Sequence, residues 1–419
     1  TRGSAGIPTA FVASWGTSGP TIGILGEYDA LPGLSQKVTP IREPVEEGAP
    51  GHACGHNLLG VASMGAALAA KHAMEHCQIP GTIRYYGCPA EETLIGKVFM
   101  ARAGVFNDLD AVLSWHPSCL NTAKRTVNTA LNSFRVNYHG IAAHAAGSPE
   151  EGRSALDGIE LMDVGVNFLR EHIIQEARIH YTITHGGRAP NIVPEFAQAW
   201  YYVRAPRRDQ VEDIYARVLD IAKGAALMSG TSHDIEFITG CYDTLINTVI
   251  SGVLQKKMEK MGPPPFVDDD RALAGSLQET FPQGSIDRSL DRIGTTREYV
   301  GDLLCEKILG PVRVDRMMGG STDVGDVSQV VPSAEITTCC WPIGTPGHSW
   351  QIVPSSGSGI GAKGMMLAAK TLALAALELE TAPDILVAAR AEFEATTQNK
   401  EYVSPIPDGV EFQLPQIQI

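Results

Sequence analysis

Residues 21–26 read TIGILG, residues 57–77 read NLLGVASMGAALAAKHAMEHC, and residues 82–87 read TIRYYG. The first and last segments are short and apolar, which is typical of buried strands. The long segment between them is rich in Ala, Leu and Met and predicts a helix with Asn57 as its N-cap and with Gly60 and Gly65 allowing close packing. A strand, a helix and a second strand in this order predict an α/β layer with a mostly parallel sheet flanked by helices.

The pattern changes after residue 128. Strand-like segments and helical segments then alternate, with strands expected at 134–139, 179–184, 196–204 and 233–239 and helices at 152–176 and 207–227. This order predicts a small α+β domain inserted into a larger one. We therefore expect a catalytic domain made of residues 1–128 and 241–419, with a lid and dimerisation domain inserted at residues 129–240. Residues 261–285 are rich in turn-forming and acidic residues and predict an exposed loop.

The composition excludes several classes of partner. The 419-residue chain has a formal net charge of −14 and no run rich in lysine or arginine, so we expect neither nucleic acid nor a membrane surface as a partner. The same charge means that an anionic substrate would need a local basic pocket. Eight cysteines without a repeated spacing predict reduced thiols and a cytoplasmic location. The chain opens at Thr1, close to a strand-like stretch, so we expect further residues before it in the natural protein.

Four short clusters hold side chains that bind metals. They are GHACGHN at 51–57, PAEE at 89–92, SWHP at 114–117 and GTPGHSW at 344–350. Thiolate and imidazole are ligands of the zinc class, and carboxylates join them in many sites. Each cluster alone has a simpler explanation, because glutamates are common at helix N-termini and a single histidine is usually structural. Together, however, they supply enough ligands for a pair of metal ions that activate water.

Glu91 and Glu92 are adjacent on what we expect to be one helix, so their carboxylates would point in different directions. One carboxylate could then bind a metal while the other acts as a general base whose pKa is raised by burial. A metal-free alternative is a cysteine-nucleophile amidase that uses Cys54 with His56 as its base. That alternative leaves the PAEE motif unexplained, and only this kind of enzyme would stay active after chelation.

Seven motifs along the chain carry a family resemblance: GEYDALP at 26–32, GHACGHN at 51–57, PAEE at 89–92, HAA at 144–146, GGRAPNIVPE at 186–195, STDVGDVS at 321–328 and PGHSWQ at 346–351. Together they resemble the superfamily of metal-dependent aminoacylases and carboxypeptidases, in particular the branch formed by the B-type subunits of aminobenzoyl-glutamate hydrolases. Other members of the wider group read Asp-Met-Asp-Ala-Leu-Pro and Cys-Gly-His-Asp where this chain has Glu-Tyr-Asp-Ala-Leu-Pro and Cys-Gly-His-Asn.

The resemblance implies that five side chains bind two divalent metal ions per chain, zinc or manganese: Cys54, His56, Glu92, His116 and His348. It implies that Glu91 is the catalytic base and that Asp29 orients one of the ligands from behind. On the inserted domain, His144 would reach into the partner's site and hold the developing oxyanion. Asn191 and Arg204 would help to bind the substrate's carboxylate.

The implied reaction is hydrolysis of the amide bond of an N-acyl or N-aroyl amino acid, such as aminobenzoyl-glutamate, by a metal-activated water. The implied assembly is a homodimer or a heterodimer with a homologous subunit. Two alternatives stay open: a broad-specificity aminoacylase or dipeptidase, and a non-catalytic partner subunit. Against the second stands the presence of all five ligands and of Glu91 in this chain.

Overall fold

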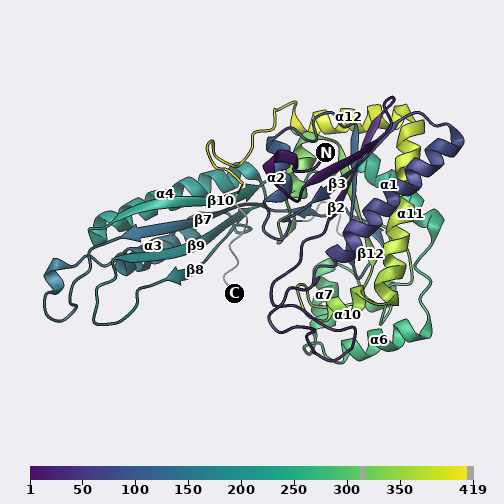
Figure 1. The fold of residues 1–419 in the computed structure, drawn as a ribbon. Coiled ribbons are helices and arrows are strands. Elements are labelled where there is room, and N and C mark those ends of the chain that lie inside the picture. Colours follow the sequence, from purple (N-terminus) through teal and green to yellow (C-terminus); the bar gives the residue numbers. More distant parts are fainter. Residues whose placement is uncertain (312–316, 413–419) are drawn as a thin grey trace.

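The computed structural model describes residues 1–311 and 317–412. The described chain forms two lobes, and a narrow lobe built on one antiparallel sheet projects from a larger α/β lobe (Figure 1). The fold class expected from the sequence is confirmed: a mostly parallel sheet flanked by helices carries an inserted α+β domain.

Six strands form the central sheet of the larger domain. Their order is β1 (Phe11–Trp15), β3 (Thr82–Cys88), β2 (Thr21–Glu27), β4 (Ala111–Ser118), β12 (Ser333–Cys339) and β5 (Thr122–Ala123). The four inner strands are parallel, and the edge strands β1 and β5 are antiparallel to their neighbours. Because parallel strands share one carboxyl edge, side chains at the ends of β2 and β4 gather in one place.

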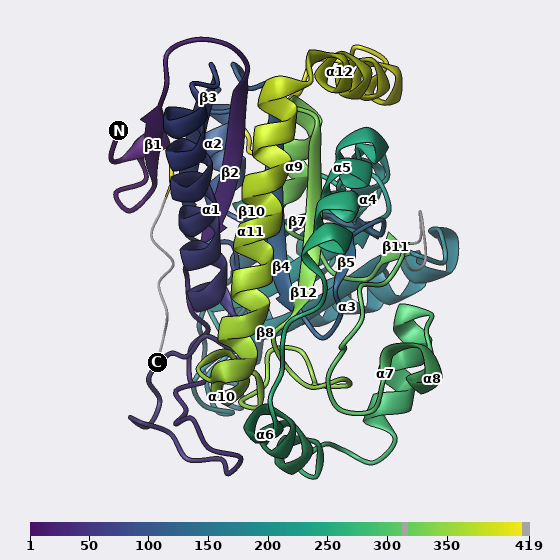
Figure 2. The ribbon, with the colours of Figure 1, turned by 90° about the vertical axis from the view of Figure 1, so that its right-hand side faces the viewer.

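Helices cover both faces of this sheet, which explains why its inner strands are apolar throughout. One face carries α1 (His56–Cys77), α5 (Thr248–Met261) and α11 (Gly359–Thr381), as Figure 2 shows. The other face carries α2 (Gly96–Arg102) and α9 (Val324–Val330). By length and composition α11 could span a membrane, but it packs against α1 and β12 inside the domain. The helices α10 (Ile352–Ser356) and α12 (Pro383–Thr397) flank α11 in the chain.

The start of α1 differs from the sequence prediction. The helix begins at His56, and its N-cap is Gly55 with φ of 77°, so the prediction of Asn57 as the cap was wrong. A left-handed N-cap favours glycine, since a side chain there would be strained. The close packing expected at Gly60 is confirmed, because a Cβ there would lie 2.9 Å from the carbonyl oxygen of Glu27. This contact brings the start of α1 against the end of β2. The same expectation for Gly65 was wrong, since a Cβ there would have its nearest neighbour, the Ala369 Cβ, at 3.9 Å.

The loop predicted at residues 261–285 contains a helix, so that prediction was also wrong. Helix α6 (Asp268–Gln278) forms there, followed by α7 (Ser285–Ile293) and α8 (Arg297–Val300). The acidic residues that indicated a loop instead stabilise the helix N-terminus, where Asp270 accepts a hydrogen bond of 2.8 Å from the backbone of Val267.

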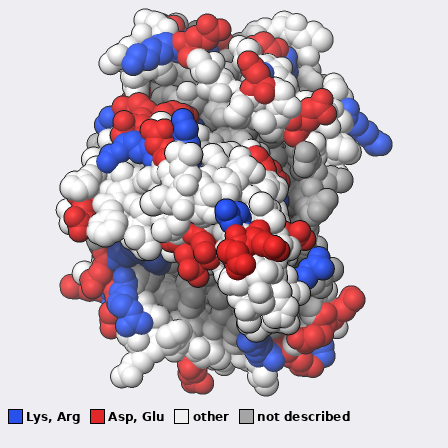
Figure 3. All heavy atoms as spheres, turned by 90° about the vertical axis from the view of Figure 1, so that its left-hand side faces the viewer, with Lys and Arg blue, Asp and Glu red and all other residues white. Residues whose placement is uncertain are grey.

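The smaller domain has a four-stranded antiparallel sheet. Its order is β10 (Ser232–Cys241), β7 (Ala130–His139), β9 (Phe196–Ala205) and β8 (Arg178–His185). Helices α3 (Ala155–Leu169) and α4 (Arg208–Ser229) cover one face, and α3 ends earlier than the sequence predicted. At the end of the molecule shown in Figure 3, basic and acidic side chains are interspersed.

Alternation along β9 decides where its polar side chains point. Its buried residues, such as Tyr201 and Val203, face α3 and α4. Tyr202 and Arg204 therefore lie on the opposite face of the sheet. Near the junction of the two domains, β6 (Val127–Asn128) pairs with β11 (Met317–Met318).

Candidate metal centre

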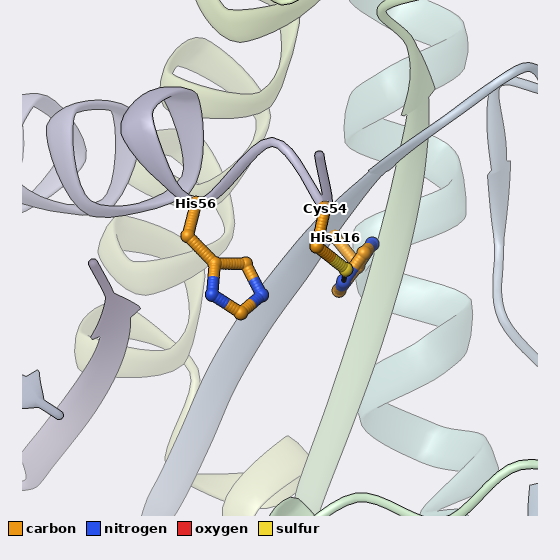
Figure 4. A group of neighbouring side chains, drawn as sticks. All are labelled: Cys54, His56 and His116. Atoms are coloured by element: carbon orange, nitrogen blue, oxygen red, sulfur yellow. Dashed lines mark hydrogen bonds between the residues drawn. The ribbon is translucent and has the colours of Figure 1, made fainter. Parts of the chain in front are cut away.

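Cys54, His56 and His116 form a cluster at the carboxyl edge of the central sheet (Figure 4). Cys54 lies in the loop before α1, His56 begins α1, and His116 lies near the end of β4. One potential ligand atom from each residue lies within 4.8 Å of the others. His116 donates a hydrogen bond of 2.7 Å from Nδ1 to the carbonyl of Pro117, so the proton of the neutral ring is on Nδ1. The Nε2 atom therefore carries a free lone pair, and it lies 3.4 Å from the Cys54 sulfur.

Asp29 connects two of the predicted ligands. One of its oxygens accepts a hydrogen bond of 2.9 Å from His56 Nδ1, and the other accepts one of 2.9 Å from the backbone N–H of Glu92. A carboxylate in this position fixes which imidazole nitrogen carries the proton and leaves Nε2 for a metal. His56 Nε2 is buried, and no group in the described part of the chain forms a hydrogen bond with it.

Glu92 and His348 form a second cluster, and it also includes Cys54. The three ligand atoms lie within 4.8 Å of one another, with His348 Nε2 at 3.5 Å from a Glu92 oxygen. His348 has a φ of 51°, which is unfavourable for a residue other than glycine by about 1–3 kcal/mol. The loop after β12 therefore holds this histidine in a strained conformation beside the cluster.

The PAEE motif does not form a helix, contrary to the sequence prediction. Residues 91–94 form a turn, Ala90 and Leu94 have left-handed backbone conformations, and α2 begins only at Gly96. The carboxylates nevertheless diverge as expected. Glu92 joins Cys54 and His348, whereas Glu91 lies with Glu27 and His56 in a third compact group.

A buried group of charges lies directly behind the clusters. Lys97 Nζ is 2.8 Å from a carboxylate oxygen of Glu27 and 2.6 Å from one of Asp323. The Lys97 and Asp323 side chains are completely inaccessible to solvent. The Lys97 ammonium lies at ion-pair distance from both carboxylates without the alignment of a good hydrogen bond, so the attraction is mainly coulombic.

The roles of Glu27 and Lys97 in this group were not predicted from the sequence. A signal was present for each. Glu27 is the single charge at the end of the apolar strand segment 21–26, and Lys97 is the single charge in the apolar run GKVFMA at 96–101. A lone charge in a buried segment needs a partner, and the partner could not be identified before the segments were placed together.

Burial raises the pKa of Glu91 well above that of an ordinary carboxyl group, and the negative charges of Glu27 and Asp323 raise it further. Lys97 and His56 oppose this shift. Burial also raises the pKa of the Cys54 thiol to about 12. A raised pKa suits a carboxylate that must accept and release a proton near neutral pH.

Arg204 lines the same cleft as the clusters. The cleft has a volume of about 410 Å³, and Cys54, Glu91 and His348 also line it. Arg204 reaches it from the inserted domain and donates a hydrogen bond of 2.9 Å to Ser321 Oγ. The guanidinium thus lines the cleft together with the candidate ligands, where the carboxylate of a bound substrate could contact it.

His144 and Asn191 do not line this cleft. They lie on loops beyond the far end of β7, where Ala145 donates a backbone hydrogen bond of 3.1 Å to the Asn191 carbonyl. His144 Nδ1 accepts hydrogen bonds of 3.2 and 2.9 Å from the backbone of Ala146 and Gly147. Since Nδ1 is an acceptor, the exposed Nε2 carries the proton and can donate a hydrogen bond to another molecule.

Comparison with known proteins places the chain in a family. Residues 128–227 match a family described as the peptidase dimerisation domain. The chain is 41% identical over 421 residues to the B-type subunit of p-aminobenzoyl-glutamate hydrolase from Escherichia coli, and the match covers 98% of this chain and 88% of that protein. The chain belongs to the M20 peptidase family.

Other similar proteins support the assignment of this chain to the M20 family. It is 31% identical to Xaa-Arg dipeptidase of Mus musculus, over 95% of this chain and 81% of that one. Its fold resembles an aminobenzoyl-glutamate utilization protein from Klebsiella pneumoniae, with a TM-score of 0.54 at 18% identity, over 88% of this chain and 74% of that one. It also resembles a dinuclear metal-binding M20 peptidase from Bacillus subtilis, with a TM-score of 0.50 at 16% identity, over 89% and 86%. The M20 protein is therefore a hydrolase of the peptidase and amidohydrolase type.

Proposed function

We propose that this M20 protein is a two-metal amidohydrolase that cleaves N-acyl or N-aroyl amino acids, with aminobenzoyl-glutamate as the first substrate to test. The observation that carries the proposal is the sharing of Cys54 by two compact ligand groups. Cys54 lies with His56 and His116 in one group and with Glu92 and His348 in the other. Each group offers three protein ligands, which is the number typical of a catalytic site with an open position.

The residues fit such ions. His56 Nε2 and one oxygen of Glu92 are buried, and neither forms a hydrogen bond with any described group. His56 Nε2 lies 3.4 Å from a carboxylate oxygen of Glu27 without forming a hydrogen bond. Burying polar atoms without a hydrogen bond is costly, and a bound cation would satisfy both. The set of sulfur, nitrogen and oxygen donors suits zinc, and the imidazoles with the carboxylate also suit manganese. The Bacillus subtilis protein with this fold is described as a dinuclear metal-binding peptidase.

When bound, the two ions would polarise the substrate carbonyl and lower the pKa of a water molecule. Glu91 accepts the proton of the attacking water and delivers it to the leaving nitrogen. Arg204 binds the substrate's carboxylate through its planar fork of donors. His144 of the partner subunit donates a hydrogen bond from Nε2 to the developing oxyanion.

The substitution Glu91→Gln tests this assignment. It removes the proton acceptor but keeps the size of the side chain, so we expect turnover to fall by at least about 10²-fold. Metal content, measured by elemental analysis, should stay unchanged because Glu91 is not among the proposed ligands. Normal turnover in this variant would remove Glu91 from the mechanism.

A second candidate function and a partner follow from the relatives. The 31% identity to a Xaa-Arg dipeptidase favours a dipeptidase as the second candidate, and a substrate panel of matched N-acyl amino acids and dipeptides with a free α-amino group separates the two. The Escherichia coli relative is a B-type subunit, and the A-type subunit from the same organism is 26% identical to about half of this chain. The proposed partner is therefore a second copy of this chain or a homologous second subunit. The eight free cysteines fit a reducing, cytoplasmic location.

The metal-free cysteine amidase fits the geometry less well. It pairs Cys54 with His56 as the base, but the imidazole nitrogen that lies 3.4 Å from the Cys54 sulfur belongs to His116. His56 instead donates its Nδ1 proton to Asp29.

A further inference from the structure

A second cavity opens beside the candidate metal centre. Its volume is about 500 Å³, and we call it the basic chamber because Lys124, Arg125 and Arg292 line it. It shares Ser118, Asn128, Gly320 and Thr337, as well as Lys124, with the lining of the catalytic cleft. Thr337 on β12 stands in register with His116 on β4. The chamber is therefore continuous with the cleft at the side of His116.

The charge of the basic chamber is opposite to that of the cleft. Among the described residues no carboxylate lines the chamber, whereas Glu27, Glu91, Glu92 and Glu335 line the cleft. Lys124 is paired with Glu335 at 2.7 Å, which offsets its charge. Arg125 and Arg292 form no ion pair with any described residue. The chain has a net charge of −14, so a cavity with two arginines that pair with no described carboxylate differs in charge from the rest of the protein.

Arg125 shows the strongest sign of an absent ligand. Its Nε is buried, and no described group accepts a hydrogen bond from it. Leu120, Ala123 and Ile293 also line the chamber, so a charge there is partly removed from water. Coulomb attraction between a guanidinium and a carboxylate is stronger in such surroundings than on an open surface. An arginine also offers a fork of donors that matches a carboxylate.

We propose that the basic chamber is a second carboxylate subsite, in which Arg125 and Arg292 bind an anionic group of the substrate. Arg204, which does not line the chamber, is left for the carboxylate of the leaving amino acid. The substrate class is thus an N-acyl amino acid with two carboxylates. The second carboxylate belongs either to an acidic amino-acid side chain or to the acyl group. This inference rests on the proposed amidohydrolase function, and it supplies the local basic pocket that an anionic substrate of so acidic a protein requires.

Four substrates separate the two sources of the carboxylate. N-benzoyl-glutamate and N-benzoyl-glutamine differ only in the charge of the side chain, and N-(4-carboxybenzoyl)-leucine and N-benzoyl-leucine differ only in the acyl group. We expect Arg125→Met to lower kcat/KM about 10- to 100-fold for the doubly charged member of one pair and to leave its neutral counterpart unchanged. The pair that responds identifies the source. An equal loss for all four substrates, or no loss, overturns the proposal.

Two further variants guard against a folding defect. Arg292 is exposed on α7, so Arg292→Met should fold normally and show the same selective loss. Arg288→Met is the matched control, since it removes the same charge one turn earlier on the same helix, outside the chamber. Arg288→Met should leave kcat/KM unchanged for all four substrates.

Binding distinguishes failure of the subsite from failure of the proposed function. In a Glu91→Gln background, calorimetry measures the affinity for the same four compounds without turnover. A selective loss of affinity in Arg125→Met supports the subsite even if the wild-type enzyme hydrolyses none of these amides, a result that would contradict the proposed function alone. Equal affinities in the variant and its parent would contradict the subsite.

Discussion

Lys97 Nζ lies 2.6 Å from a carboxylate oxygen of Asp323, and neither side chain is exposed to solvent. Lys97 comes from α2 and Asp323 from the residue before α9, so the pair connects two helices on one face of the sheet. The same ammonium contacts Glu27 at the end of β2. This group of charges therefore joins the segment that carries Glu91 to the sheet and to α9, and it fixes the position of the proposed base.

Replacing Lys97 by Met should destabilise the protein strongly. The change leaves Glu27 and Asp323 buried without their cation, and removing one partner of a buried pair costs about 3–5 kcal/mol. Urea denaturation measures the free energy of unfolding. Lys71→Met is the control, because Lys71 forms only a surface pair with Glu75 and its loss should cost less than about 1 kcal/mol. An equal, small effect of both substitutions would show that the buried pair contributes little.

Removing Asp29 should weaken metal binding without touching a ligand. Asp29→Ala removes the acceptor of the hydrogen bonds from the His56 ring and from the backbone N–H of Glu92. We therefore expect metal affinity to fall about 10- to 100-fold. Titration with zinc against a competing chelator measures this loss. Asp29→Asn, which can still accept one of the two hydrogen bonds, should lose less. Unchanged affinity in both variants would mean that Asp29 does not orient the site.

Mixed dimers test whether His144 acts on its partner's site. Glu91→Gln and His144→Ala should each be inactive as homodimers. In a refolded equimolar mixture, half of the dimers are mixed, and each contains one site with both groups, so about a quarter of wild-type activity should return. A mixture that stays inactive would contradict the role of His144 across the interface.

Stability should depend on pH through Glu380, far from the metal centre. Burial in α11 raises the pKa of Glu380 to about 8, above the ordinary value of 4.5. The folded state therefore favours the protonated form, so this contribution to stability is fully present below about pH 4.5 and is lost as the pH rises through 8. Glu380→Gln should raise the free energy of unfolding at pH 9 by about 1–2 kcal/mol and change it little at pH 4.5. Equal effects at both pH values would exclude this titration.

The sequence predicted the sheet-and-helix order and the inserted domain because hydrophobic periodicity and strand-helix alternation are local signals. Helix α6 was missed because Asp268–Gln278 looks like an acidic loop until its N-terminal aspartates are seen to cap it. The ion pairs of Lys97 could not be predicted, since its partners lie about 70 and 226 residues away along the chain and meet only through the sheet. The strained φ of His348 and the left-handed cap at Gly55 likewise depend on the assembled site.

The basic chamber also could not be predicted from the sequence, because it forms from segments that are far apart along the chain. Arg125 and Arg292 are ordinary surface-like residues in the sequence, and the whole inserted domain lies between them along the chain. Folding brings β5, β6 and α7 together and places both side chains on one cavity. Only the need for some basic pocket, given the net charge of −14, could be read from composition.

The most direct test of the central claim is metal content by elemental analysis, combined with amidase activity before and after chelation. Two groups of ligands that share Cys54 predict about two ions per chain. Activity should be lost on chelation and restored by Zn²⁺ or Mn²⁺. A chain that binds no metal after reconstitution, or that keeps its activity through exhaustive chelation, would contradict the two-metal amidohydrolase.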